Sequence, residues 1–352
     1  MGIAIAVSVI QLRTNRSTVK HPLFCDRNLP LLICGTAGVP GYNAFSHFRR
    51  KYGERVIGQR TVKNWPLQRE GIVACDVENT PEFQRLLKTF KIRTVINCGG
   101  SCALKSCELD PQMAARVNVH TVDKILEGIA KTNIQLLHLS IDLVFSGIGS
   151  GDYVETDPTD PVTVYGKTMV VAEQMILQRR SEACILRISL PMGVSFNGHA
   201  GAIDWIQHRF AKNKPATLYF DEIRTPTYVE CMNDVYEEVV ARKLSGIYHA
   251  GGPQKLSLFQ IAQIVNRVGG YDPGLLIGCP RLDAGPIPPR AGNVSLNSQK
   301  LMDALQREPF VPWPLRKEHF PSHTDWHFER SGFRGSKELL VSHLYDRPSG
   351  SC

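Results

Sequence analysis

The chain has 352 residues, of which 43% are hydrophobic and 21% charged, as expected of a globular protein with a sizeable core. This length predicts two domains, or one large domain with an appended lobe. The net charge of +8 comes from scattered lysines and arginines without a long basic run. The pattern gives no support to nucleic-acid binding, whereas an anionic small molecule fits the charge.

The ten cysteines are irregularly spaced, and none shows the spacing of a zinc site. We therefore expect no metal, and reduced, mostly buried thiols in a cytoplasmic protein. The first ten residues are apolar, but they lack the basic start of a signal peptide and are too short to cross a bilayer. No contact with a membrane is expected, and residues 1–28 are interpreted as a poorly ordered extension.

The stretch from Leu31 to Phe45 predicts a phosphate-binding turn. Residues 31–34 indicate a short buried strand, an amphipathic helix follows, and three glycines with G-x-x-G-x-x-G spacing stand between them. Glycines let the backbone approach a pyrophosphate, and the amino end of a helix presents free N–H groups and a partial positive charge. The alternative is a glycine-rich turn without a ligand. The candidate cofactor-binding residues here are Gly35, Gly38, Val39, Pro40 and Gly41.

The end of the second predicted strand, residues 54–59, indicates which cofactor is bound. A carboxylate at this place would hold the ribose 2′-hydroxyl of NAD. The chain has Gln59 and Arg60 there and no acid. Because a guanidinium suits a 2′-phosphate, NADP is preferred, with NAD as the other option. The alternative for Arg60 is an ordinary solvated loop charge.

Strands alternate with helices over the first half of the chain. We expect further strands at residues 72–75, 94–97, 135–139 and 183–188, with amphipathic helices between them. This order predicts an α/β fold, a Rossmann-type doubly wound parallel sheet with helices on both faces. Ligands of such sheets bind at the carboxyl ends of the strands. The candidate cofactor contacts at these ends are Asp76, Val77, Cys98, Gly99 and Ser140.

The strand–helix rhythm breaks after Met192, where glycine, proline and aromatic content rises. We expect an NAD(P)-binding Rossmann domain over residues 29–192 and a smaller substrate-binding lobe over residues 193–310, with parts of the two interleaving. Residues 311–352 predict a C-terminal tail. From about residue 320 few apolar residues follow a helical or strand period, so extended or disordered chain is expected there.

Four short motifs, GTAGVPG, SIDLVF, VYGKT and PRAGNVSLN, occur in the order and spacing of one family. Through them the chain resembles the dTDP-4-dehydrorhamnose reductase family of the extended short-chain dehydrogenases/reductases, over about residues 30 to 305. The resemblance implies NAD(P)H-dependent reduction of the 4-keto group of a nucleotide-linked sugar, as in dTDP-rhamnose biosynthesis. The non-catalytic regulatory β subunit of methionine adenosyltransferase belongs to the same group, so the fold does not guarantee chemistry.

The resemblance implies a catalytic set of a hydroxyl residue, a tyrosine and a lysine four positions after the tyrosine. Tyr165 matches the tyrosine, which hands a proton to the substrate oxygen and also contacts the cofactor. The lysine position is Met169 and the threonine position is Ile141. Lys167 points to another side of the helix and is a poor replacement. Two of the three catalytic positions have therefore lost their polar group.

Candidate substrate contacts surround this position. By resemblance these are Asp142, Val144 and Phe145 after the fifth strand, and two loop arginines, Arg224 and Arg290. Arginine suits a nucleotide diphosphate through paired donors. A loop salt bridge is the equally good alternative for both arginines.

Two hypotheses of function follow from the sequence. The first is an NAD(P)H-dependent reductase of a nucleotide-linked 4-keto sugar. The second is a non-catalytic NAD(P)-binding regulatory or scaffold protein, which the residues at positions 169 and 141 favour. The expected partner is a nucleotide-sugar or a similar anionic small molecule, and a homodimer is compatible with the sequence.

Overall fold

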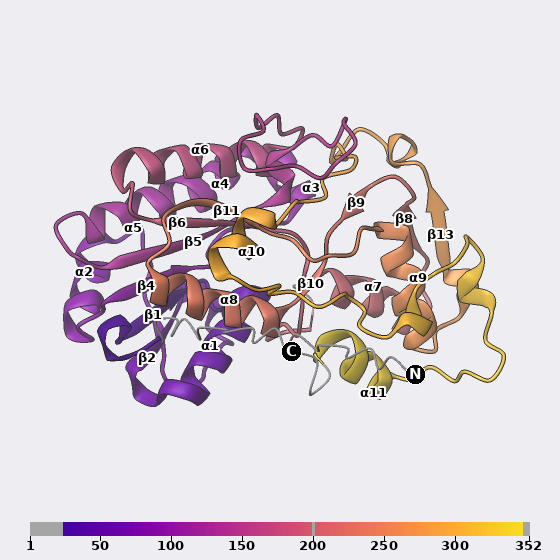
Figure 1. Ribbon diagram of the computed structural model, residues 1–352, viewed down its shortest axis with the longest axis horizontal. Coiled ribbons are helices and arrows are strands. Elements are labelled where there is room, and N and C mark those ends of the chain that lie inside the picture. The colour runs from indigo at the N-terminus through magenta and orange to yellow at the C-terminus, as the bar shows by residue number, and fades with distance from the viewer. Residues whose placement is uncertain (1–23, 199–200, 348–352) are drawn as a thin grey trace, which may run out of the picture.

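A parallel sheet of seven strands lies at the centre of the larger lobe of the molecule (Figure 1). The computed structural model describes residues 24–198 and 201–347. Every neighbouring pair of strands in this sheet is parallel. In spatial order the strands are β11 (Gly246–Ala250), β6 (Cys184–Ile188), β5 (Gln135–Ile141), β4 (Thr94–Asn97), β1 (Leu31–Cys34), β2 (Val56–Arg60) and β3 (Ile72–Ala74).

The strand order reverses at β1. From β1 the chain continues outward through β2 and β3 on one side, and through β4, β5 and β6 on the other. Cys34, the last residue of β1, stands beside Gln59 of β2 and Asn97 of β4. The crevice at the carboxyl ends of these strands is where ligands bind doubly wound sheets.

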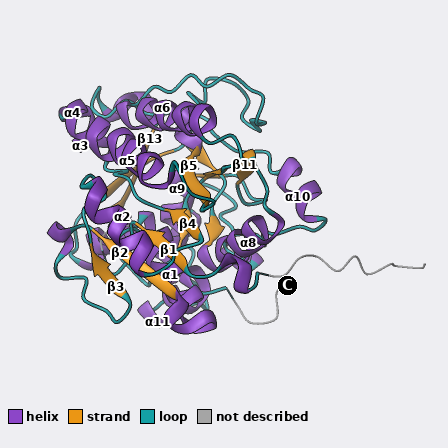
Figure 2. Cartoon of the chain, turned by 90° about the vertical axis from the view of Figure 1, so that its left-hand side faces the viewer, coloured by secondary structure: helices purple, strands orange, loops and turns teal. Residues whose placement is uncertain are grey.

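Helices cover both faces of the sheet (Figure 2). Because successive side chains of a strand point to opposite faces, β1 serves two cores. Leu31 and Ile33 pack with α1 (Val39–Tyr52) and α8 (Val229–Arg242). Leu32 and Cys34 pack with α2 (Thr80–Thr89), α5 (Thr121–Ile129) and α6 (Val164–Arg179). The predicted α/β fold with a doubly wound sheet is confirmed. The helices of this lobe are α1 (Val39–Tyr52), α2 (Thr80–Thr89), α3 (Leu104–Leu109), α4 (Pro111–Ala115), α5 (Thr121–Ile129), α6 (Val164–Arg179), α8 (Val229–Arg242) and α10 (Gln299–Leu305).

The smaller lobe consists of short strand pairs and two helices. Strand β8 (Ala216–Tyr219) pairs with β13 (Leu276–Cys279), and β9 (Ile223–Arg224) pairs with β12 (Leu256–Ser257). The two helices are α7 (Ala202–Ala211) and α9 (Leu258–Val268).

The chain crosses between the lobes more than once. Strand β7 (Pro191–Met192) pairs with β10 (Thr227–Tyr228), after which α8 returns to the larger lobe and packs on α1. Strand β11 then joins the central sheet beside β6. Residues 229–250 therefore belong with the sheet, and residue 192 is not a single point of division between the lobes.

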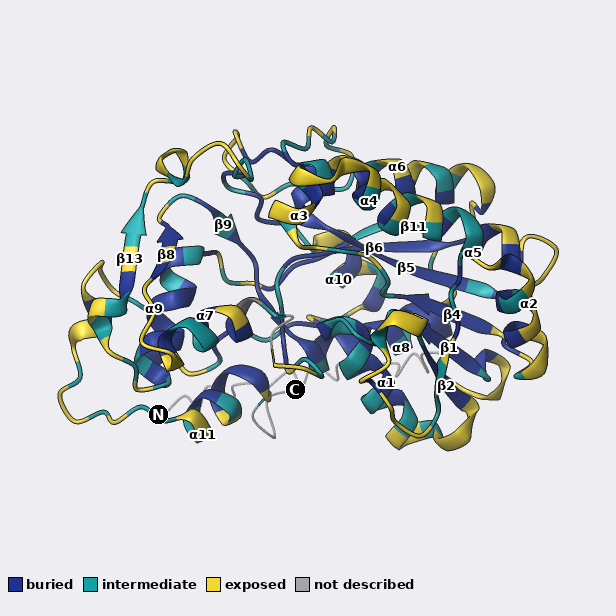
Figure 3. Cartoon of the chain, turned by 180° about the vertical axis from the view of Figure 1, so that it is seen from behind, coloured by how far each residue is buried: buried dark blue, intermediate teal, exposed yellow. Residues whose placement is uncertain are grey.

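The C-terminal segment is folded, so the prediction of extended or disordered chain is wrong for residues 320–347. Trp313 is fully buried, and its Nε1 donates a hydrogen bond to the carbonyl oxygen of Leu344, 2.8 Å away. The Tyr345 hydroxyl donates to Asp204 of α7. Helix α11 (Lys337–Leu340) lies beneath the smaller lobe (Figure 3). Single side chains far apart in the sequence, such as Trp313 and Tyr345, hold this segment in place. Its sequence therefore shows no hydrophobic periodicity that would predict a folded segment.

The start of the described chain is also packed. Phe24 is buried against Phe48 and Tyr52 of α1, with ring centroids 5.4 and 4.9 Å apart. Residues 26–28 form a 3₁₀ turn whose Asn28 side chain reaches α8. The expected poor order is therefore wrong for residues 24–28, and the rest of the predicted extension lies outside the described residues.

The buried pair of His319 and His343 predicts acid sensitivity of the C-terminal segment. Their ring nitrogens are 2.9 Å apart, and burial lowers the pKa of His319 from 6.5 to about 4. Because the folded chain binds this proton more weakly than the unfolded chain, the stabilisation is complete above pH 6.5 and is lost as the pH falls towards 4. Between pH 7.5 and pH 5 we expect the free energy of unfolding to fall about 2 kcal/mol more in the wild type than in His319→Gln. Urea unfolding followed by tryptophan fluorescence measures this difference, and equal falls in the two proteins would contradict it.

Candidate functional site

Two glycines shape the turn between β1 and α1. Gly35 has a φ of +77°, and a Cβ on it would lie 2.5 Å from the backbone nitrogen of Gly99. A Cβ on Gly41 would lie 2.3 Å from the carbonyl oxygen of Gly35. No side chain fits at either position, so the turn, the loop after β4 and the first turn of α1 pack backbone to backbone.

Gly38 has a different part in the same turn. A Cβ there would make only ordinary van der Waals contacts, the nearest 3.8 Å from the carbonyl oxygen of Gly35, so the turn itself tolerates a small side chain at this position. Gly38 caps α1 without a side chain, and the first turn of the helix carries no acidic residue. Among the described residues the N–H groups of Val39 and Gly41 have no partner, and Pro40, which lacks an N–H, suits this first turn. The turn therefore fits a pyrophosphate.

The end of β2 carries a buried amide in place of a carboxylate. Gln59 is 3% exposed, and its Oε1 accepts a hydrogen bond from the Gly35 N–H at 3.1 Å. Its Nε2 donates to the carbonyl oxygen of Cys75, just after β3, at 2.6 Å. Gln59 thus ties the ends of three strands together and does not face a ligand.

Arg60 keeps its charge available at the edge of the crevice. Its Nη1 donates to the carbonyl oxygens of Thr61 and Val62, at 3.0 and 3.4 Å. In the described part of the chain it forms no ion pair with a carboxylate. The nearby carboxylate of Asp76 accepts a hydrogen bond from the Val62 N–H at 2.9 Å and so holds the loop.

The loop after β4 lies against the glycine turn. The Gly99 N–H donates to Asn97 Oδ1 at 3.0 Å, and the Cys98 N–H donates to the carbonyl oxygen of Cys34 at 3.1 Å. Burial raises the pKa of both thiols, so neither is a thiolate nucleophile at neutral pH. The structure thus brings Gly35, Cys98 and Gly99 together, whereas the Val77 side chain is buried in the core.

Tyr165 lies in the first turn of α6. Thr163 caps the helix, and a Cβ on Gly166 would lie 2.1 Å from the carbonyl oxygen of Leu143, so this end of α6 is pressed against the turn after β5. The phenol is 7% exposed, and its hydroxyl has no hydrogen-bond partner among the described residues. Burial raises the pKa of Tyr165 well above its ordinary value, Asp142 adds to the rise and Arg224 opposes it. At pH 7 the hydroxyl is therefore a neutral, free donor.

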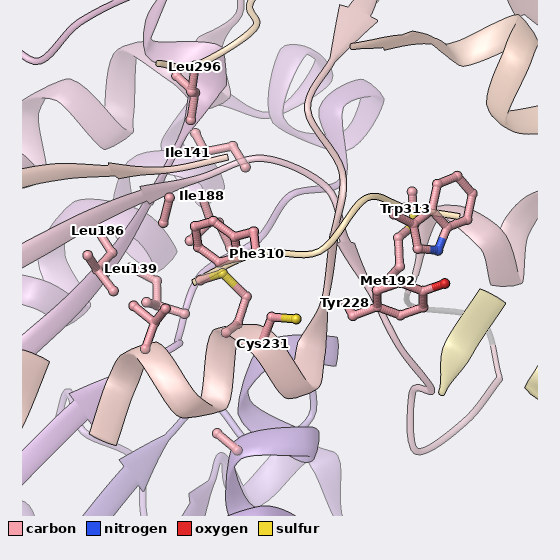
Figure 4. Close-up of a cluster of buried hydrophobic side chains, with 14 of the residues drawn as sticks. Leu139, Ile141, Leu186, Ile188, Met192, Tyr228, Cys231, Leu296, Phe310 and Trp313 are labelled. Carbon is pink, nitrogen blue, oxygen red and sulfur yellow. The ribbon is translucent and has the colours of Figure 1, made fainter. Parts of the chain in front are cut away.

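The side chains at the two substituted catalytic positions are packed in the core. Met169 is 4% and Ile141 8% exposed, and both belong to the same buried apolar cluster as Tyr165. Figure 4 shows Ile141 beside Ile188 and near Leu296. Lys167 is exposed to solvent, on another side of α6. Helix α6 therefore supplies no cation beside the phenol.

Ser140 belongs to a buried polar network between β5, β6 and α6. Its hydroxyl donates to Glu173 of α6 at 2.5 Å, and Glu173 forms an ion pair with Arg187 of β6 at 2.8 Å. Arg187 in turn contacts His249 of β11, with 3.3 Å between their nitrogens. The hydroxyl faces α6, so the structure does not bring Ser140 together with the glycine turn.

Asp142 and Arg224 are paired with each other. Asp142 follows β5, Arg224 lies in β9, and their side chains are 0% and 4% exposed. Arg224 Nε donates to Asp142 Oδ2 at 2.6 Å, Nη2 donates to Oδ1, and the Ser189 hydroxyl donates to Oδ2 at 2.6 Å. For Arg224 the structure contains the salt bridge that the sequence left open as an alternative to a phosphate contact.

Val144 and Phe145 are both fully buried. The ring of Phe145 stacks on that of Tyr153, with centroids 4.1 Å apart and an interplanar angle of 6°. The turn after β5 folds both side chains into the core, and a substrate contact of these two residues stays a prediction.

Arg290 stays partly open to solvent. Its side chain is 22% exposed and lies over the ring of Tyr219, 4.5 Å from the centroid. In the described residues no group of three or more His, Cys, Asp and Glu side chains could hold a metal ion. No helix of this part of the chain is long and apolar enough to cross a membrane.

A Rossmann-type crevice, a tyrosine at the start of a neighbouring helix and a second lobe over the carboxyl edge are the features of an extended short-chain dehydrogenase/reductase. The family model of the RmlD substrate binding domain matches residues 30–313. The chain therefore belongs to this family, that of the dTDP-4-dehydrorhamnose reductases, and the predicted family is confirmed.

The curated relatives are distant. The dTDP-4-dehydrorhamnose reductase of Aggregatibacter actinomycetemcomitans is 30% identical over 194 residues, which are 53% of this chain and 65% of that protein. Methionine adenosyltransferase 2 subunit beta of Xenopus laevis is 26% identical over 238 residues, or 66% of this chain and 69% of the relative. The chain thus spans about two thirds of the length of these relatives.

Solved structures show the same fold. One is the dTDP-4-dehydrorhamnose reductase of Bacillus anthracis in complex with NADP, with a TM-score of 0.68 and 16% identity over 80% of this chain and 95% of that chain. Another is the dTDP-glucose 4,6-dehydratase of the same organism in complex with NAD, with a TM-score of 0.68 and 16% identity over 88% and 99% of the two chains.

Gly38→Ala separates cofactor binding from folding. The added Cβ makes only ordinary van der Waals contacts and the φ of −81° suits alanine, so we expect the melting temperature to stay within about 3 °C of the wild type. A dinucleotide resting on the turn would meet this Cβ, and we expect the dissociation constant of NADPH to rise at least about tenfold. Fluorescence titration with NADPH measures it. Gly149→Ala, after β5, is the control, because its Cβ would also make only an ordinary contact, 3.8 Å from the Tyr153 hydroxyl. Unchanged affinity in Gly38→Ala would contradict the assignment of the turn.

Proposed function

We propose that this protein binds NADPH in the crevice at β1 and reduces the 4-keto group of a nucleotide-linked sugar. The observation that carries the proposal is the hydroxyl of Tyr165, which has no partner among the described residues, in a fold whose glycine turn after β1 fits a pyrophosphate. The family membership and the NADP complex of a structural neighbour support the cofactor. The names of the relatives support the substrate class.

When bound, the nicotinamide supplies the hydride. The chain's own residues hold the phosphates and supply the proton. The N–H groups of Val39 and Gly41 would receive the pyrophosphate, and Arg60 would face a 2′-phosphate. Tyr165 would donate its Oη proton to the substrate oxygen, and the high pKa of this phenol keeps the proton in place at pH 7.

The missing cation limits the rate that this site can reach. As the proton leaves, Tyr165 becomes a phenolate, and the nearest α6 position for a stabilising charge is occupied by Met169. Loss of one donor to a developing oxyanion lowers rates about 10²–10³-fold. Ile141 offers no hydroxyl to the substrate, so a second contact is lost. We therefore expect slow turnover.

A second function, cofactor binding without turnover in a regulatory or scaffold role, is favoured by the same substitutions. The glycine turn that would bind the pyrophosphate is intact, whereas the side chains at positions 141 and 169 are apolar and buried. The similarity to a subunit named methionine adenosyltransferase 2 subunit beta supports this candidate. A cytoplasmic location and a homodimer stay predictions from the sequence.

Variants of α6 distinguish the two functions. With NADPH and dTDP-4-dehydrorhamnose we expect Tyr165→Phe to lower NADPH oxidation at least about 100-fold, because the proton donor is lost. We expect Met169→Lys to raise it about 10–100-fold, because a cation then faces the phenolate. The rate is followed by the absorbance of NADPH, and folding is checked by the melting temperature.

Lys167→Met is the matched control, because it changes a charge on the same helix at an exposed position. We expect it to leave the rate unchanged. Tight NADPH binding with no oxidation in the wild type would support the second function. An unchanged rate in Tyr165→Phe would refute the assigned proton donor.

Arg60→Ala tests the choice between the two nicotinamide cofactors. The guanidinium has no carboxylate partner among the described residues, so a 2′-phosphate is its expected ligand. We expect the ratio of NADPH to NADH affinity to fall about tenfold or more, with NADH affinity unchanged. Titration of both cofactors measures the ratio. Arg50→Ala, an exposed arginine on α1, is the control. An equal loss for both cofactors would contradict a 2′-phosphate contact.

A further inference from the structure

Glu222 is a buried carboxylate that accepts no hydrogen bond from the described residues. It precedes β9 and is 1% exposed. Its nearest cations are Nη1 of Arg224 and Nη1 of Arg290, each 3.7 Å from a carboxylate oxygen and so beyond hydrogen-bond distance. Its Oε2 is fully buried and without a partner in this part of the chain. Since buried polar atoms are normally satisfied, this oxygen indicates a missing donor.

Arg290 supplies unused donors at the same place. Its guanidinium lies over the ring of Tyr219, 4.5 Å from the ring centroid, and makes no hydrogen bond to a described residue. Its Nε is buried and also lacks a partner there. The side chain of Arg290 is 22% exposed, so a ligand can reach it from solvent, whereas Arg224 is paired with Asp142.

The missing group must both donate and accept. It has to donate to the carboxylate of Glu222 and accept from the guanidinium of Arg290. A phosphate only accepts and an ammonium only donates, whereas an alcohol does both. Oε2 of Glu222 and Nη1 of Arg290 lie 3.7 Å apart. A hydroxyl oxygen about 2.8 Å from each of them donates to the first and accepts from the second.

We propose that Glu222 and Arg290 form a recognition site for a hydroxyl group of the substrate's sugar. The site lies near Tyr165, because Arg224 links Glu222 to Asp142, and Asp142 begins the turn that the first turn of α6 touches. This inference rests on the proposed function, which supplies the sugar. It makes Glu222 the residue that distinguishes a nucleotide-sugar from the nucleotide alone.

The test compares dTDP-glucose with dTDP as probes, by calorimetry on the full chain. In the wild type we expect dTDP-glucose to bind about tenfold or more tightly than dTDP. Glu222→Met removes the acceptor, and we expect the two probes then to bind equally, with dTDP affinity unchanged. Glu222→Gln keeps an acceptor oxygen and restores part of the preference. If Glu222→Met fails to fold, Arg290→Met, at a partly exposed position, is expected to remove the preference for dTDP-glucose over dTDP as well.

Asp221→Asn is the matched control. Asp221 is the neighbouring acid, it pairs with Arg281, and its loss changes the net charge equally. We expect the sugar preference to survive in this variant, and its loss there would refute a hydrogen bond specific to Glu222. Equal binding of both probes to the wild type, with a resident water between Glu222 and Arg290, would overturn the hydroxyl site and leave the proposed function standing. No binding of either probe would overturn the proposed substrate class as well.

Discussion

The buried ion pair between Asp142 and Arg224 determines how the two lobes meet. Asp142 lies at the end of β5 in the larger lobe, and Arg224 lies in β9 of the smaller one. Ser189 donates a further hydrogen bond to the same carboxylate. A buried charge that loses its partner is destabilising by about 3–5 kcal/mol. The pair therefore holds the lobes in one arrangement, with the turn after β5 pressed against the helix that carries Tyr165.

The same pair also decides which groups remain for a ligand. Arg224 and Asp142 satisfy each other, so neither charge is available to a ligand. What remains is the open turn at Gly38 for phosphates, the free phenol of Tyr165, and the stacked guanidinium of Arg290. The site thus divides into a backbone part in the larger lobe and a side-chain part shared by both lobes.

Local features of the sequence predicted the fold and the glycine turn, because both are encoded over short stretches. The spacing of Gly35 and Gly41 reflects backbone contacts a few residues apart, together with one close approach to Gly99. The ion pair of Arg224 could not be predicted in this way, since its partner Asp142 lies 82 residues away and only the fold brings the two together. The buried C-terminal segment was missed because single anchors such as Trp313 replace a continuous period.

The packing around Tyr165 has opposite effects on the binding of a carbonyl group and on its reduction. A neutral phenol without an internal partner is a good hydrogen-bond donor to a ligand oxygen, and burial strengthens that bond. The same burial opposes the phenolate that proton transfer would leave, and Met169 offers it no charge. We therefore expect the apolar residues at positions 141 and 169 to weaken proton transfer more than ligand binding. A chain of this kind can keep its cofactor and its ligand long after it has lost most of its rate, which is how a reductase site becomes a binding site.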